Sequence, residues 1–172
     1  PEAWSRIMQG FFRILSESVE RFEGFVDKFT GDGIMALFGA PIAHEDHAQR
    51  ACWAALQARE AVARYATEVK REHGLAFSMR LGLHSGEVVD GTIGDDLRMS
   101  YTAQGHTVGL AQRMEALASP DTCYLSAATA ELVAAEAAAL AGSDAADHPA
   151  LGITAIAHGE LGPVCFVRGA TR

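Results

Sequence analysis

Two short segments of the chain carry residues whose types and spacing suit metal and phosphate chemistry. In the first, residues 25–34, Lys28 stands four positions before Asp32, and a glycine follows Asp32. An Asp-Gly pair between two apolar runs predicts a tight hairpin. A carboxylate at the tip of such a hairpin is rigid and exposed, which suits binding of a hard cation such as Mg²⁺. A plain hairpin with a solvated lysine explains this segment, taken alone, equally well.

The second segment, residues 101–114, combines a glycine-containing turn with a helix that carries an arginine. Thr102 precedes the turn at Gly105, and Arg113 lies two helical turns beyond His106. The N-terminus of a helix with an arginine nearby is a favourable place for phosphate oxygens. The alternative is a core helix with a solvated arginine, and this segment alone favours that alternative.

The elements that must position these residues can be predicted from periodicity and from the residues that end helices and strands. Helices are expected over 2–21, 45–72, 107–117 and 126–139, the last capped by a serine; strands are expected over 25–30, 34–38, 77–89, just before residue 101, over 123–125, and as a closing pair within 153–168. Residues 142–148 are expected to form a loop. The order predicts an α/β (α+β) fold with a ferredoxin-like βαββαβ core, a mainly antiparallel sheet and its first strand missing.

Composition narrows the function. The 172 residues suit a single domain over 1–172, and no apolar run in them is long enough to span a membrane. The net charge of −8 argues against a nucleic-acid partner. Three widely spaced cysteines fit neither a disulfide framework nor a zinc site, and this favours the cytoplasm. The His-Glu-Asp-His run at 44–47 is expected to cap a helix and to complement its dipole, not to bind a metal.

Together the two segments resemble the catalytic domain of class III adenylyl and guanylyl cyclases. The family pattern has a lysine, a Gly-Asp hairpin tip and an apolar strand, followed later by a Gly-x-Thr-Val-Asn-x-Ala-x-Arg helix. In this chain the matching positions are Lys28, Gly31 with Asp32, and Gly105–Arg113; further segments that look like the family are Phe38–Pro41, Arg80–Gly86 and Leu161–Gly169. The resemblance covers nearly the whole chain.

The resemblance implies a role for five residues. Asp32 would be one of two carboxylates that hold two ions, Mg²⁺ or Mn²⁺, and Lys28 and Thr102 would contact the purine. Arg113 would stabilise charge at the reacting phosphate, and Arg168 stands where the family usually has a lysine near the phosphates. The reaction would be attack of the ribose 3′-hydroxyl of ATP on the α-phosphorus, giving 3′,5′-cyclic AMP and pyrophosphate.

The resemblance also implies partners. Family sites form between two subunits, so Asp32 of one chain in a homodimer would face Arg113 of the other. Thr102 and the lysine at position 28 favour ATP over GTP, since guanine recognition in the family usually shows glutamate in place of that lysine. The domain is expected to be fused to other domains, with no membrane segment within this chain.

Two departures from the family pattern bear on activity. The first metal-binding aspartate of the family lies on a strand before the first helix, and residues 1–172 contain no such residue. Asp27 is expected to be a poor substitute, because neighbours on a regular strand point to opposite faces, and Lys28 is its neighbour. Gly109 stands where the family has an asparagine that bonds near the ribose. Residues 1–172 by themselves are therefore expected to have little activity, and the alternative function is a weak or inactive nucleotide-binding regulatory domain.

Overall fold

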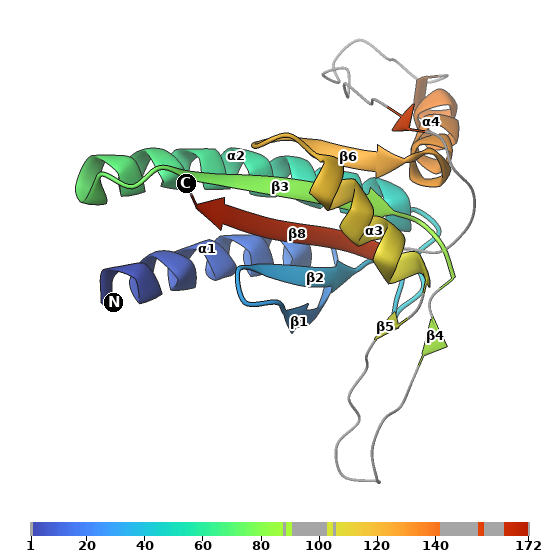
Figure 1. Cartoon of the computed structure of the whole chain (residues 1–172). Helices are drawn as coiled ribbons and strands as arrows, with labels where there is room; N and C mark the ends of the chain where they lie inside the picture. Colours follow the sequence, from blue (N-terminus) through green and yellow to red (C-terminus); the bar gives the residue numbers. More distant parts are fainter. Residues whose placement is uncertain are drawn as a thin grey trace, which may run out of the picture.

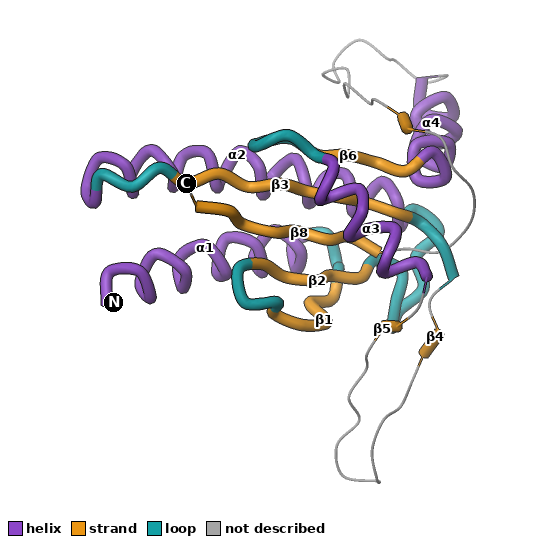
Figure 2. Tube along the Cα trace, viewed as in Figure 1, coloured by secondary structure: helices purple, strands orange, loops and turns teal. Residues whose placement is uncertain are grey.

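The computed structural model describes residues 2–87, 89–90, 103–104, 106–141, 155–156 and 164–171. Figures 1 and 2 show one sheet with long helices beside it. In chain order the elements are α1 (Glu2–Arg21), β1 (Phe25–Phe29), β2 (Gly33–Leu37), α2 (His47–His73), β3 (Phe77–His84), β4 (Val89–Asp90), β5 (Ala103–Gln104), α3 (His106–Leu117), β6 (Cys123–Ser126), α4 (Ala127–Ala141), β7 (Ala155–Ile156) and β8 (Val164–Thr171).

The main sheet has six strands in the order β1-β2-β8-β3-β6-β7. The pairs β1–β2, β2–β8 and β8–β3 are antiparallel, whereas β3–β6 and β6–β7 are parallel. A separate pair joins β4 to β5. The mixed α/β architecture with a mainly antiparallel sheet agrees with the fold predicted from the sequence.

Most of the predicted element bounds are confirmed within one or two residues. The first helix ends at Arg21 as expected, and the second ends at His73, just before Gly74, which adopts the left-handed conformation with φ of 68°. The backbone N–H of Thr129 donates to the Ser126 Oγ at 3.3 Å, so Ser126 caps α4 as predicted. The third strand is shorter than predicted and ends at His84. The loop predicted at 142–148 lies outside the described residues.

The two strands predicted within 153–168 are present as β7 and β8, but the prediction that they form a pair is wrong. β7 pairs in parallel with β6, and β8 lies between β2 and β3 and is antiparallel to both. Figure 1 shows β8 running through the middle of the sheet. Local pattern identifies a segment as a strand, but the choice of its neighbours depends on contacts with residues far away in the sequence.

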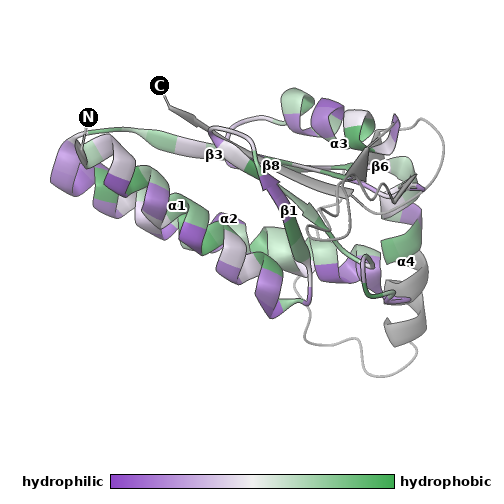
Figure 3. Cartoon of the chain, turned by 90° about the horizontal axis from the view of Figure 1, so that it is seen from below, coloured by the Kyte–Doolittle hydropathy of each residue, from purple (hydrophilic) through white to green (hydrophobic). Residues whose placement is uncertain are grey.

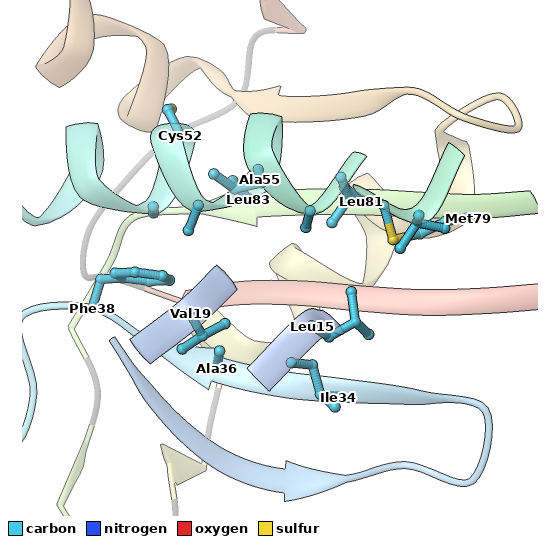
Figure 4. Packing of buried hydrophobic residues seen from close by; sticks show 14 of the residues in the cluster. Leu15, Val19, Ile34, Ala36, Phe38, Cys52, Ala55, Met79, Leu81 and Leu83 are labelled. Atoms are coloured by element: carbon cyan, nitrogen blue, oxygen red, sulfur yellow. The ribbon is translucent and has the colours of Figure 1, made fainter. Parts of the chain in front are cut away.

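The hydrophobic core lies between the sheet and the pair α1–α2. All five residues of β2 are buried, and in Figure 4 Leu15 and Val19 of α1 lie close to Ile34 and Ala36 of that strand. Eight residues of α2 are buried, and most are alanines, which let the helix approach its neighbours closely: Ala48, Ala51, Cys52, Ala54, Ala55, Ala58, Val62 and Val69. The strand that follows Asp32 is thus held in place by the packed layer of α1 and α2.

α3 covers the opposite face of the sheet. Met79, Leu81 and Leu83 of β3 belong to the core cluster on the α1–α2 side, and alternation along the strand turns Gly82 to the other side, where α3 lies. Figure 3 shows α3 on one side of the sheet and α1 and α2 on the other. The result is a three-layer arrangement of helices, sheet and helix.

Candidate functional site

The hairpin between β1 and β2 places Asp32 on its turn as the sequence predicts, but the residue is half-buried and not fully exposed. The backbone N–H of Thr30 donates to the Gly33 carbonyl at 2.8 Å, and that of Asp32 donates to the Thr30 carbonyl at 3.0 Å. Gly31 has φ of 78°, a left-handed conformation that favours glycine. These bonds fix the turn, so the half-buried Asp32 carboxylate is carried by a rigid backbone.

A β-bulge in β1 changes the expected position of Asp27 relative to Lys28. The pairing of β1 with β2 shifts between Val26 and Lys28, and Asp27 has no partner in the register. The Lys28 Nζ lies 3.6 Å from the Asp27 Oδ2; the Asp27 side chain is fully buried, whereas that of Lys28 is 43% exposed. The expectation that these two side chains point to opposite faces is wrong, because a bulge breaks the strict alternation of a regular strand.

The contact between α3 and β3 fixes the rotation of α3 about its axis. The buried residues of α3 are Thr107, Ala111 and Glu115, which are spaced four apart on one face. A Cβ added to Gly82 would lie within 3.0 Å of the backbone of Ala111 and of Glu115. Only a glycine lets the helix come this close to the strand.

Two polar contacts hold α3 in the same orientation. The Thr107 hydroxyl donates to the Glu87 carbonyl at 2.6 Å near the start of the helix. Toward its end, the Glu115 Oε1 lies 3.3 Å from the Nε of Arg80 on β3. The Glu115 side chain is only 4% exposed, and a buried carboxylate is stable only with a cation or hydrogen-bond donors beside it.

This orientation turns Arg113 and Gly109 away from the sheet. Each lies two residues from the buried positions, which is about 200° around a helix of 3.6 residues per turn. Arg113 is exposed. A Cβ added to Gly109 would meet nothing within 4 Å. Arg113 and the position expected to carry the family asparagine therefore share one outward face of α3.

For the other two predicted site residues, the structure describes only the backbone of Arg168 and does not describe Thr102. Thr102 and the neighbouring Gly105 lie outside the described residues. The backbone of Arg168 in β8 is paired with Gly33 on one side and with Arg80 on the other. The structure thus brings the main chain of Arg168 next to Gly33, the residue that follows Asp32, although the two are 135 positions apart in the sequence.

The described residues supply one carboxylate suited to a metal ion. They contain no group of three or more His, Cys, Asp or Glu side chains that could hold a metal. Asp32 lies on the turn where a metal ligand is expected, but Asp27 is buried beside the Lys28 ammonium, which would repel a cation. The residues therefore fit one ligand of the expected metal site and do not complete it.

The segment 44–47 does not cap α2 through a side chain. Asp46 stands at the N-cap position but makes no side-chain capping bond. Its Oδ1 instead accepts a hydrogen bond from the Arg50 Nε at 2.7 Å, which holds the pKa of Asp46 below its usual value. Arg50 also pairs with Glu23 at the end of α1. This charged cluster links two helix ends, so the prediction of capping is wrong.

A buried polar network at the ends of β3 and β6 escaped sequence reasoning. The His84 Nδ1 is 2.8 Å from the Ser126 Oγ, and the Thr129 hydroxyl donates to the Ser85 Oγ at 2.9 Å. Burial lowers the pKa of His84, and the charge of His106 lowers it further. The residues are 42 to 44 positions apart, so no local spacing signals the network.

The protein-family model for the adenylate and guanylate cyclase catalytic domain matches residues 1–147 of this chain. The chain belongs to this family. The cyclase domain is 36% identical over 118 residues to adenylate cyclase 1 of Rhizobium meliloti and 30% identical over 124 residues to the adenylate cyclase of Anabaena cylindrica. These matches cover 68% and 70% of this chain but only 18% and 24% of the relatives. The chain spans about a fifth of their length.

Solved structures agree with this assignment. The cyclase domain matches the guanylyl cyclase Cya2 with a TM-score of 0.71 and 27% identity, over 99% of this chain and 81% of that one. It matches the adenylyl cyclase CyaB from P. aeruginosa with a TM-score of 0.72 and 22% identity, over 99% and 83% of the two chains, which supports the fold. Within the described residues, none of the helices is long and apolar enough to cross a bilayer.

The close contact at Gly82 leads to the first prediction. Gly82→Ala should destabilise the cyclase domain by about 3 kcal/mol, because the added methyl meets backbone atoms that cannot rotate away. Urea unfolding followed by circular dichroism gives the measurement. The matched control is Gly109→Ala on α3, where space is open and the substitution should stabilise the helix by about 1 kcal/mol. An unchanged unfolding midpoint in Gly82→Ala would contradict the assigned packing.

Proposed function

We propose that this cyclase domain belongs to an adenylyl cyclase, which converts ATP to 3′,5′-cyclic AMP and pyrophosphate. The observation that carries the proposal is the hairpin that holds Lys28 and Asp32 on one rigid unit. The Lys28 ammonium suits a purine, and the Asp32 carboxylate suits a metal ion that binds the phosphates. The two relatives named adenylate cyclase support ATP as the substrate. The reaction is attack of the ribose 3′-hydroxyl on the α-phosphorus.

The proposed choice of ATP depends on the Lys28 ammonium. An ammonium only donates hydrogen bonds, and adenine offers an acceptor at N1, whereas guanine carries a hydrogen there. Thr102 would bond the same edge of the base. A polar site built for one pattern rejects another because its groups are left without partners. Position 28 carries a lysine and not the glutamate that is usual in guanine recognition.

The phosphates would be met by residues from three elements. Asp32 would hold one ion, Mg²⁺ or Mn²⁺, which when bound neutralises charge on phosphate oxygens. Arg113 projects from the outward face of α3 and would stabilise charge at the reacting phosphate. Arg168 would contact the same chain of phosphates from β8. Placed donors are needed because the protein's net charge of −8 repels an anionic substrate.

A homodimer with two shared sites is part of this proposal. Asp32 belongs to the β1–β2 hairpin and Arg113 to α3, so the two roles come from separate elements. A twofold interface repeats each contact, and it would pair Asp32 of one chain with Arg113 of its partner twice. The open outward face of α3 is free of packing against this chain's own sheet, which suits it for such a contact.

Gly109 favours a second candidate function, a domain that binds nucleotide but turns it over slowly. The family asparagine expected at this position is absent, and the space where its side chain would lie is open. Loss of one positioned transition-state hydrogen bond costs about 10²–10³ in rate. Glycine in place of asparagine at position 109 would therefore be enough to make turnover of the nucleotide slow.

Substrate choice can be tested directly on the longest natural form of the protein that contains these residues. The ratio kcat/KM should be higher for ATP than for GTP, with Mg²⁺ and with Mn²⁺. Lys28→Glu should lower kcat/KM for ATP about 100-fold, because a donor is replaced by an acceptor at the base edge. Lys70→Glu, an exposed lysine on α2, is the matched control and should change neither value. Turnover of GTP equal to that of ATP would refute the substrate assignment.

The shared site can be tested by complementation. Asp32→Ala and Arg113→Ala should each abolish cyclic AMP formation when present in both subunits. A mixture of the two variants should recover about a quarter of the wild-type activity, because random pairing puts half of the chains into heterodimers with one intact site each. Recovery is measured as cyclic AMP formed per dimer, with heterodimers quantified through two affinity tags. A mixture that stays inactive while heterodimers form would eliminate the shared-site proposal.

The role of Gly109 can be tested by restoring the family side chain. Gly109→Asn should fold normally and raise kcat at least about tenfold, because the open space admits the amide and one positioned hydrogen bond is gained. Gly109→Ala separates this gain from helix stabilisation, since it removes the glycine without adding a hydrogen-bonding group. If both variants change kcat equally, the asparagine has no catalytic role in this protein.

A further inference from the structure

Asp27 is the most completely buried acidic group beside the candidate site. Its side chain is fully buried, and neither carboxylate oxygen has a hydrogen-bond partner among the described residues. The Lys28 Nζ lies 3.6 Å from its Oδ2. The bulge between Val26 and Lys28 makes this contact possible between residues that are adjacent in the sequence.

The burial of Asp27 needs a compensating partner. Removing a carboxylate from water is costly unless a cation or hydrogen-bond donors replace the lost solvation. Lys28 is the cation that the structure places there, and it is 43% exposed. The buried carboxylate thus holds the inner side of the ammonium while its outer side stays open to a ligand.

A metal role for Asp27 is disfavoured by the same geometry. A divalent cation at this carboxylate would have to displace the Lys28 ammonium or lie against it, and like charges at such a distance repel. The Asp27 carboxylate is also closed to solvent. Its interaction is therefore with the lysine.

We propose that Asp27 is a positioning residue that fixes the Lys28 ammonium, so that the pair Asp27–Lys28 sets the choice of purine. This inference rests on the proposed function, in which Lys28 meets the base. A lysine has a flexible four-carbon stem and three donors. A free one could swing from N1 of adenine to O6 of guanine, since both accept hydrogen bonds. A lysine held by a buried carboxylate is restricted to one direction and discriminates between the two bases.

The test is a double-mutant cycle on the longest natural form of the protein. Asp27→Asn keeps the size of the side chain and removes its charge; it is combined with Lys28→Met, which removes the ammonium. The readouts are the Kd values of fluorescent ATP and GTP analogues, together with KM and kcat where turnover is measurable. Thermal unfolding of each variant reports on stability. Asp27→Ser provides a second way to remove the carboxylate should Asp27→Asn not fold.

Asp27→Asn should weaken ATP-analogue binding about tenfold, the size expected for coupled neighbours, and raise KM more than it lowers kcat. The preference for ATP over GTP should fall by a similar factor. In the Lys28→Met background the same substitution should change Kd less than twofold, because no ammonium remains to be positioned.

Two results would overturn the inference, and they can be told apart. If Asp27→Asn weakens binding equally with Lys28 and with Met at position 28, Asp27 acts through the fold and not through the lysine. If the natural protein binds the ATP analogue but Lys28→Met leaves its Kd unchanged, Lys28 does not meet the base. The second result removes the proposed role of Lys28, whereas the first leaves that role intact.

Discussion

The close approach of α3 to β3 at Gly82 is the contact on which the arrangement of the site depends. No other residue would let the backbones of Ala111 and Glu115 lie so near the strand. Because one face of α3 is committed to this contact, Gly109 and Arg113 must face outward. The Arg80–Glu115 ion pair adds charge complementarity to the same interface, and removal of either partner would leave a poorly solvated charge.

The other half of the site depends on two adjacent strands, β2 and β1. The core anchors β2, which is buried along its whole length, whereas β1 lies at the edge of the sheet. An edge strand can accommodate a bulge, because only one neighbour has to follow the irregular register. The bulge brings Asp27 and Lys28 together without disturbing the turn that carries Asp32. The buried strand β2 thus supports the turn that carries Asp32, and the edge strand β1 sets the position of Lys28.

In the proposed function, the two halves of the site would meet different chemical requirements of the substrate. A purine is recognised by direction, so the donor that meets it must be held in one orientation, and a buried carboxylate can do this. Phosphates are recognised by positive charge, which a metal ion held by Asp32 and the guanidinium groups of Arg113 and Arg168 would supply in the proposed site. These three residues lie on separate elements. The proposed sites between two subunits would be compatible with this division, since the hairpin and α3 are separate units.

The sequence by itself determined the helices, the Asp-Gly hairpin, the mixed fold and the family. These follow from local signals: periodicity, helix-ending glycines, and the motifs around Asp32 and Arg113. Only the tertiary structure decided that β8 lies between β2 and β3, that Asp27 contacts Lys28, and that His84 joins a buried network with Ser126. The physical reason is that strand pairing and burial depend on surfaces distant in the sequence, and a bulge reverses an alternation that the sequence pattern alone presents as regular.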